Sequence, residues 1–192
     1  MATLFVDKID PQSGTSLEIG TSGDTISVPS GATINLSAAT QTGVGGTNTP
    51  NFSAMASGSQ TISTSTNTVL TFANELYDTD SSYDGTNKFT VPSGKAGKYI
   101  FNGNARIDSM YDGDDVILAF MKNGSSDLGD EDYSSITRQT MAEDNGSVYF
   151  GITAQVNCAV SDYIQMSIYQ TRGSDRTTTA NYTRFSGYKL IE

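Results

Sequence analysis

The chain has 192 residues, a formal net charge of −10 and no histidine. It contains 24 serines, 25 threonines and 19 glycines, a composition that favours short strands joined by tight turns. The negative charge argues against nucleic acid and anionic membrane surfaces as partners, because both require a basic face. The absence of histidine excludes the usual Ser-His-Asp and Cys-His relays and the commonest zinc ligand.

Residues 1–16 carry Leu4, Phe5, Val6 and Ile9, with little around these apolar side chains to cover them. Exposed apolar residues near a terminus are typical of a segment that becomes buried in a partner. We therefore predict that residues 1–16 are an anchor segment. The segment lacks the regions of a secretory signal, and no stretch approaches the ~20 apolar residues that span a membrane. We expect synthesis in the cytoplasm, with no export signal and no membrane insertion.

Residues 17–50 are predicted to form a fibre shaft followed by a hinge. Between residues 17 and 36, pairs of apolar residues recur at intervals of nine and eight residues, separated by turn signals at 20–24 and 29–31. One chain cannot bury the apolar faces of such short strands, so we predict that three chains wrap together. A flexible Ser/Thr/Gly linker is the alternative. Residues 38–50 lack the periodicity and are the predicted hinge. The apolar pairs are Leu17 and Ile19, Ile26 and Val28, and Ile34 and Leu36.

Residues 51–192 are predicted to be the globular domain, since they hold all ten tyrosines and seven of the eight phenylalanines. No stretch shows the sustained 3.6-residue period of an amphipathic helix, so we expect almost no helix. The expected strands are 51–56, 68–72, 88–91, 97–107, 115–121, 147–160, 163–169 and 184–191.

One expected strand is apolar on both faces. In a two-sheet sandwich, the side chains of residues 116–121 should point alternately to the core and to the outside. Both of these alternating sets are apolar in this strand. The set that does not face the core consists of Ile117, Ala119 and Met121. We predict that these three side chains contact a neighbouring subunit.

Acidic residues cluster between expected strands, which is typical of solvated loops. Oxygen-rich loops also suit calcium, and the candidates are Asp112, Asp114 and Asp115, although the full EF-hand spacing is absent. Paired carboxylates could also serve a glycosidase, but no paired aromatic cleft accompanies them. We therefore expect no catalytic residue, no enzyme activity and no cofactor other than this candidate calcium.

Four tyrosines lie in or beside expected loops and are candidates for stacking on sugars or packing on a protein partner. The alternative is that they only anchor their loops. They are Tyr77, Tyr83, Tyr111 and Tyr133.

Four segments in the second region form a pattern. They are Phe52-Ser53-Ala54; Phe89-Thr90-Val91-Pro92, leading through Gly94 and Gly97 to Lys98-Tyr99-Ile100-Phe101; Met121-Lys122-Asn123-Gly124; and Phe185-Ser186-Gly187-Tyr188-Lys189-Leu190. In this order they resemble the jelly-roll head shared by tumour necrosis factor and the globular head of the first complement component. The resemblance implies that residues 51–192 form an antiparallel two-sheet jelly-roll knob, and that the all-β protein is a homotrimer. The family usually has Gly-Asp before its penultimate strand, whereas this chain has Ser161-Asp162.

Residues 24–36 resemble the shaft and anchor segments of phage tail-fibre and head-fibre proteins. Combined with the jelly-roll head, this resemblance implies a structural fibre protein of a bacteriophage virion, held by its N-terminus to capsid or tail proteins and displaying a trimeric knob for attachment or decoration. Two alternatives stay open: a receptor-binding adhesin that recognises a host surface glycan or protein, and an enzyme that depolymerises surface polysaccharide.

Overall fold

The structure is a computed structural model in which the chain divides into two compact units, Met1–Val44 and Gly45–Glu192. Every strand of the described chain belongs to the second unit, the knob. The residues that the structure describes are 9, 13–17, 19–35, 48–125 and 136–190.

The described part of the N-terminal unit contains tight turns and no strand. The Asp24 amide donates to the Thr21 carbonyl at 3.0 Å, and the Asp24 carboxylate accepts from the Thr21 amide at 2.7 Å. A second turn forms where the Ala32 amide donates to the Pro29 carbonyl at 3.1 Å. Both turns lie where the sequence predicts them, and the described residues between and beside them form no strand.

The apolar pairs of the predicted shaft lie in solvent. This exposure agrees with the argument that one chain cannot bury them, and the three-chain shaft itself stays a prediction. Leu36 lies outside the described residues. The exposed fractions are 45% for Leu17, 63% for Ile19, 63% for Ile26, 43% for Val28 and 59% for Ile34.

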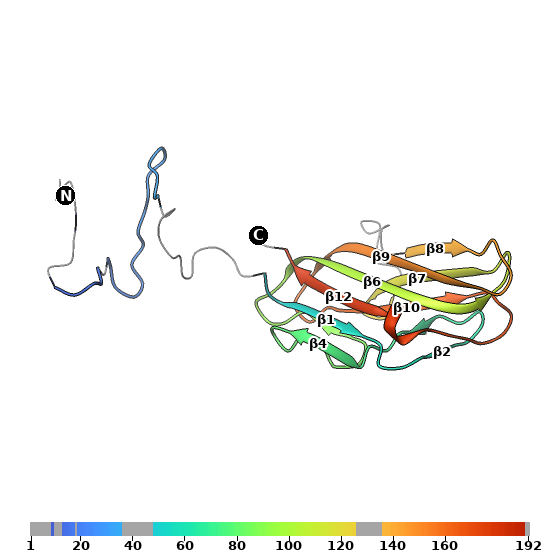
Figure 1. The fold of residues 1–192 in the computed structure, drawn as a ribbon. Coiled ribbons are helices and arrows are strands. Elements are labelled where there is room, and N and C mark those ends of the chain that lie inside the picture. Colours follow the sequence, from blue (N-terminus) through green and yellow to red (C-terminus); the bar gives the residue numbers. More distant parts are fainter. Residues whose placement is uncertain (1–8, 10–12, 18, 36–47, 126–135, 191–192) are drawn as a thin grey trace. The chain divides into compact units, whose positions relative to one another are not determined.

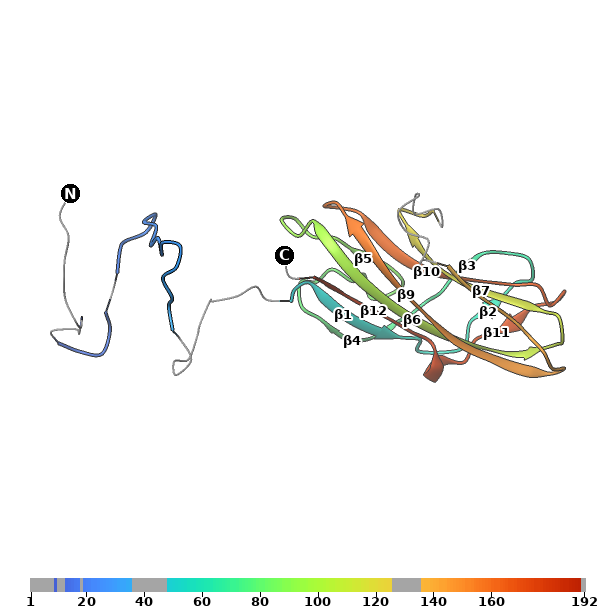
Figure 2. The ribbon, with the colours of Figure 1, turned by 90° about the horizontal axis from the view of Figure 1, so that it is seen from above.

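The knob is an antiparallel sandwich of two main sheets (Figures 1 and 2). The first sheet has the order β4-β1-β12-β6-β9. The second has the order β3-β10-β7-β8, with β5 also paired to β10, and β11 and β2 form a small separate ladder. The elements are β1 Asn51–Met55, β2 Thr61–Ile62, β3 Thr68–Val69, β4 Asn74–Asp78, β5 Phe89–Thr90, β6 Gly97–Met110, β7 Asp115–Lys122, β8 Ile136–Thr140, β9 Gly146–Cys158, β10 Tyr163–Gln170, β11 Arg176–Thr177, the 3-10 turn η2 Ala180–Tyr182 and β12 Arg184–Lys189.

The strand register gives the knob two distinct ends. Asn51, at the start of β1, pairs with Tyr188 at the end of β12, so the chain enters and leaves at one end, which we call the proximal end. Met110 of β6 pairs with Gly146 of β9 at the opposite, distal end. The distal end carries the loops 63–67, 111–114, 141–145 and 171–175, which lie to the right in Figure 1.

The core lies between the two sheets and is built from alternate residues of each strand. Its centre is a group of phenylalanine rings in mutual contact, with centroids 4.8 to 6.1 Å apart for Phe52, Phe101, Phe120 and Phe185. All four side chains are fully buried. Burying each one stabilises the fold by about 1.5–3 kcal/mol relative to exposure.

Gly187 explains part of the C-terminal pattern. A Cβ atom at this position would lie 2.4 Å from Cδ1 of Phe101 and 3.0 Å from Cε1 of Phe52. Only glycine therefore lets β12 pass so close to these rings.

The long strands agree with the sequence-based expectations, and the described residues contain no helix longer than the three-residue turn η2. The Asn123-Gly124 turn is confirmed, since both residues have positive φ (54° and 81°) and Lys122 exchanges backbone hydrogen bonds with Ser125. The expectation was wrong for residues 70–72, which follow β3 without being a strand. It also missed β2, β4, β8, β11 and η2.

Candidate functional site

The outward face of β7 carries the predicted subunit contact. β7 lies between β10 and β8, and its inward-facing side chains are fully buried in the core. On the other face, Ile117 and Met121 are partly exposed and Ala119 is buried among its neighbours. The structure therefore places these three residues on one outward face, as the alternation predicts.

The surroundings of this face are apolar at its centre. Ala119 lies between Ser167 of β10 and Ile136 of β8, and Ile136 is 52% exposed. The Ser167 hydroxyl is buried and has no hydrogen-bond partner among the described residues. Charged side chains lie toward both rims, where Asp115 pairs with Arg138, the register partner of Ile117, and where Lys88 lies over the Tyr163 ring. Such a face suits contact with another protein better than contact with water.

A second arrangement lies on the outward face of the first sheet, near its distal end. The Asp108 carboxylate accepts hydrogen bonds from Arg106 Nε at 2.8 Å, Ser147 Oγ at 2.6 Å and Thr179 Oγ1 at 2.6 Å. Partial burial raises the pKa of Asp108, but these hydrogen bonds outweigh that effect and hold the pKa below its ordinary value. The Asp108 carboxylate is thus charged and held in place, and it orients the side chain of Arg106.

Arg106 in turn supports two exposed tyrosines. Its guanidinium lies 5.2 Å from the ring centroid of Tyr182, and Tyr182 meets Tyr149 edge to face at 5.6 Å. Asn104 Nδ2 donates to the Tyr149 hydroxyl at 3.2 Å and to the Tyr182 carbonyl at 2.7 Å. Tyr149 and Tyr182 nevertheless keep 56% and 44% of their surface exposed. We call Asn104, Arg106, Asp108, Tyr149 and Tyr182 the tyrosine–arginine cluster.

Sequence reasoning missed this cluster because its members come from three segments that meet only through the sheet. Register pairs Arg106 of β6 directly with Tyr149 of β9, while η2 brings Tyr182 back from a distant part of the chain. The one available signal was the alternation of β9, which places Tyr149 on its exposed side.

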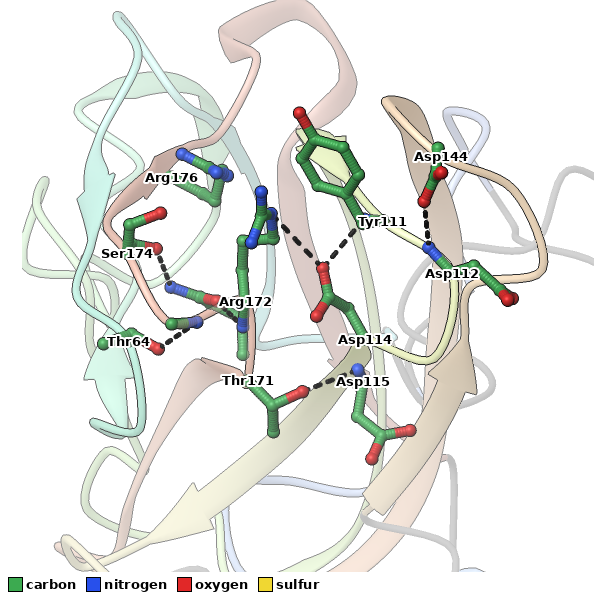
Figure 3. Close-up of polar contacts among 12 residues, drawn as sticks. Thr64, Tyr111, Asp112, Asp114, Asp115, Asp144, Thr171, Arg172, Ser174 and Arg176 are labelled. Atoms are coloured by element: carbon green, nitrogen blue, oxygen red, sulfur yellow. Dashed lines mark hydrogen bonds and ion pairs between the residues drawn. The ribbon is translucent and has the colours of Figure 1, made fainter.

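The predicted calcium loop lies at the distal end, and Figure 3 shows its polar contacts. Asp114 accepts a hydrogen bond from the Tyr111 amide at 2.8 Å and pairs with Arg172, whose Nε is 3.5 Å away. The Arg172 guanidinium stacks on the Tyr111 ring at 3.7 Å from its centroid. Asp114 therefore faces a guanidinium within the same loop cluster.

Asp115 makes hydrogen bonds through its carboxylate, and Asp112 makes one through its backbone amide. Asp115 accepts hydrogen bonds from Arg138 and Thr140, which lower the pKa of Asp115. The Asp112 amide donates to the Asp144 carboxylate at 3.2 Å. Over the described ranges, no three His, Cys, Asp or Glu side chains converge on one point. Calcium binding at this loop stays a prediction, and it would have to compete with the two arginine pairs.

Comparison with known proteins gives the fold of the knob. No protein-family model and no curated protein matches the chain. The globular domain of zebrafish complement 1qA protein is similar, with a TM-score of 0.55 and 15% identity over 74% of this chain and 98% of that domain. Eiger TNF from S. frugiperda has a TM-score of 0.50 and 10% identity over 76% of this chain and 95% of that one. PRD1 vertex protein P5 has a TM-score of 0.50 and 13% identity over 76% of this chain and 99% of that one.

The knob has an antiparallel jelly-roll fold that resembles the TNF and C1q domains. This confirms the predicted architecture of antiparallel sheets for the second region. At these identities the likeness establishes the fold alone, so the homotrimer and the phage role stay predictions.

Within this jelly-roll knob, the four candidate loop tyrosines have different positions. Tyr77 is 53% exposed, on β4, and Tyr111 is partly covered by Arg172. Tyr83 is 6% exposed, and its hydroxyl donates to the Phe72 carbonyl at 3.0 Å, so this tyrosine anchors its loop, as the alternative interpretation predicts, and is not an exposed binding residue. Its burial raises the pKa of the Tyr83 hydroxyl. Tyr133 lies outside the described residues.

The structure describes only one of the four apolar residues of the predicted anchor, and the anchor stays a prediction. Ile9 is 55% exposed, while Leu4, Phe5 and Val6 lie outside the described residues. Among the helices of the described residues, none is long and apolar enough to cross a membrane.

Proposed function

We propose that this chain is a structural fibre protein of a bacteriophage virion. Its N-terminal segment binds another particle protein in the capsid or tail, and its jelly-roll knob is displayed as a homotrimer. The chain has no catalytic role in this proposal. The observation that carries it is the pairing of a compact jelly-roll knob with an N-terminal segment whose regularly spaced apolar side chains are exposed in a single chain.

Charge supports self-association of the N-terminal segment. The chain has a net charge of −10, yet residues 25–50 contain no Asp, Glu, Lys or Arg, and the predicted shaft and hinge carry charge only at Glu18 and Asp24. In a parallel assembly of three identical chains, every side chain meets two copies of itself, so any charge would meet like charges at the same level. An uncharged run with apolar pairs avoids this repulsion and offers faces to bury.

The comparisons support the proposal in two ways. The TNF and C1q heads provide the fold, and proteins of this type are typically homotrimers. PRD1 vertex protein P5 shows that a similar fold occurs in a phage vertex protein. We propose that the outward face of β7, with Ile117, Ala119 and Met121, is buried between the three copies.

The decisive experiment removes the proposed anchor. Deletion of residues 1–16 should leave a folded, trimeric knob, because the core of the knob lies wholly within the second unit. The truncated protein should no longer join the particle when it replaces the full-length chain during assembly. If it still joins the particle, the anchor lies elsewhere in the chain.

A receptor-binding adhesin is the second candidate function. The tyrosine–arginine cluster favours it, because exposed tyrosine and arginine side chains are typical of recognition surfaces. Depolymerase activity remains the third, and release of reducing ends from host polysaccharide by the purified protein would establish it.

A further inference from the structure

We propose that the tyrosine–arginine cluster is a binding site for a neutral saccharide. The inference goes beyond the proposed fibre role, since anchoring through the N-terminus does not require a ligand on the knob. It rests on three properties of the cluster: exposed aromatic surface, side chains held in fixed positions, and the absence of net charge.

The two tyrosine rings of the cluster expose much of their surface. Tyr149 and Tyr182 are 56% and 44% exposed although they lie against each other and against the sheet. Aromatic rings in this situation pack against the C–H faces of a pyranose ring, since such faces are apolar while the sugar hydroxyls point outward. Two rings in edge-to-face contact offer differently oriented surfaces to one or two sugar units.

The rings are held from behind, which limits the ordering that binding would require. Asn104 fixes the hydroxyl of Tyr149 and the backbone carbonyl of Tyr182 at once. Arg106 covers part of the Tyr182 ring, and Asp108 holds Arg106. Ser147 and Thr179 also donate hydrogen bonds to the Asp108 carboxylate, beside the cluster.

Polar groups for sugar hydroxyls lie within the same cluster. A guanidinium has five N–H donors, more than the contacts of Arg106 to Asp108 and Ser147 use. The Asn104 side chain adds an amide carbonyl beside the two rings. A few polar groups fixed beside an apolar surface are the usual composition of a small-molecule site.

Charge selects a neutral ligand. Asp108 offsets the charge of Arg106, so the cluster itself carries no net charge, although the exposed Arg184 of β12 lies opposite Asn104. The net charge of the chain, −10, repels anionic polysaccharides at a distance. A neutral hexose or N-acetylhexosamine meets no such repulsion.

The test uses the full-length chain and ligand-observed NMR. The probes are methyl glycosides of glucose, galactose, mannose and N-acetylglucosamine, with glucuronic acid as the acidic comparison. At least one neutral glycoside should bind, and glucuronic acid should not. Tyr149→Ala and Tyr182→Ala should each weaken binding about tenfold. Tyr149→Phe keeps the ring and loses only the hydrogen bond from Asn104, so it should weaken binding less than Tyr149→Ala. Tyr77→Ala is the matched control, because Tyr77 is equally exposed on the opposite edge strand of the same sheet.

Three results would overturn the proposal. No binding of any neutral glycoside would do so, as would alanine variants that bind as well as the parent. A lower oligomeric mass of Tyr149→Ala or Tyr182→Ala would show instead that a second copy of the chain occupies the cluster. The thermal unfolding of each variant is measured in parallel, and only variants that unfold cooperatively are compared with the parent chain. None of these outcomes bears on the particle incorporation that tests the fibre role.

Discussion

The substitution Ile117→Asp tests the proposed subunit contact directly. In a free subunit its cost should be small, because Ile117 lies on an outward face and is already partly exposed. Its cross-strand neighbour on β8 is Arg138, and an opposite-charge pair across strands contributes about 0.2–1 kcal/mol. We therefore expect the melting temperature of the isolated subunit to change little.

In the trimer the same carboxylate would be buried against another copy. Arg138 is already paired with Asp115, so the new carboxylate would be buried without a partner of its own, at a cost of about 3–5 kcal/mol. Threefold symmetry repeats the cost three times, about 9–15 kcal/mol per trimer, which corresponds to at least about six orders of magnitude in the association constant. At micromolar concentration the variant should therefore have the subunit mass of 20.4 kDa, measured by sedimentation or light scattering, while the parent has three times that mass.

The matched control is Thr153→Asp. Thr153 is exposed on β9, on the outward face of the other sheet. The substitution therefore adds the same charge at a comparable position. A trimeric Ile117→Asp variant would refute the assignment of the contact to β7. Dissociation of the Thr153→Asp variant alone would place the contact on the first sheet.

Three further predictions concern the knob itself. Gly187→Ala should lower the free energy of unfolding by about 1–3 kcal/mol through overpacking, measured by urea denaturation, whereas Gly58→Ala, with open space around it, should not. Burial raises the pKa of Asp108 and Asp162, but hydrogen bonds and a cation outweigh it and lower both. The stability that the two carboxylates contribute should be complete above the unfolded pKa of about 3.9 and be lost as the pH falls through the lower folded pKa. In a plot of melting temperature against pH, Asp162→Asn should therefore reduce the slope in this range. An unchanged slope would contradict the assignment. The calcium prediction for residues 112–115 requires that a chelator lower the melting temperature by mass action, and identical melts with and without chelator would count against it.

The long strands could be predicted because their signals are local. The apolar alternation of β7 and β10 follows from side chains that point to opposite faces at every step. The Asn123-Gly124 turn needs only two residues that accept positive φ. The jelly-roll fold was expected from the resemblance of the aromatic and glycine motifs to a known family, and the structure explains one of these residues, since Gly187 is required by the packing of β12 on the core rings.

The short strands could not be predicted in this way. β4 and β8 are mostly exposed and show no clean alternation, so neighbouring strands, rather than their own side chains, decide that they are strands. Tyr83 lies in an acidic, loop-like stretch, yet the fold buries its ring beside Phe52. Burial at such positions depends on what the rest of the chain places above them.

Local pattern thus accounts for the alternating strands, the turns and the exposed apolar pairs of the N-terminal segment, since each depends on residues within a few positions of one another. The two candidate surfaces of the knob depend on contacts between distant segments. The outward face of β7 acquires its neighbours only when β8 and β10 pair with it. The tyrosine–arginine cluster forms only when the register of β6 with β9 sets Arg106 beside Tyr149, and η2 brings Tyr182 onto both.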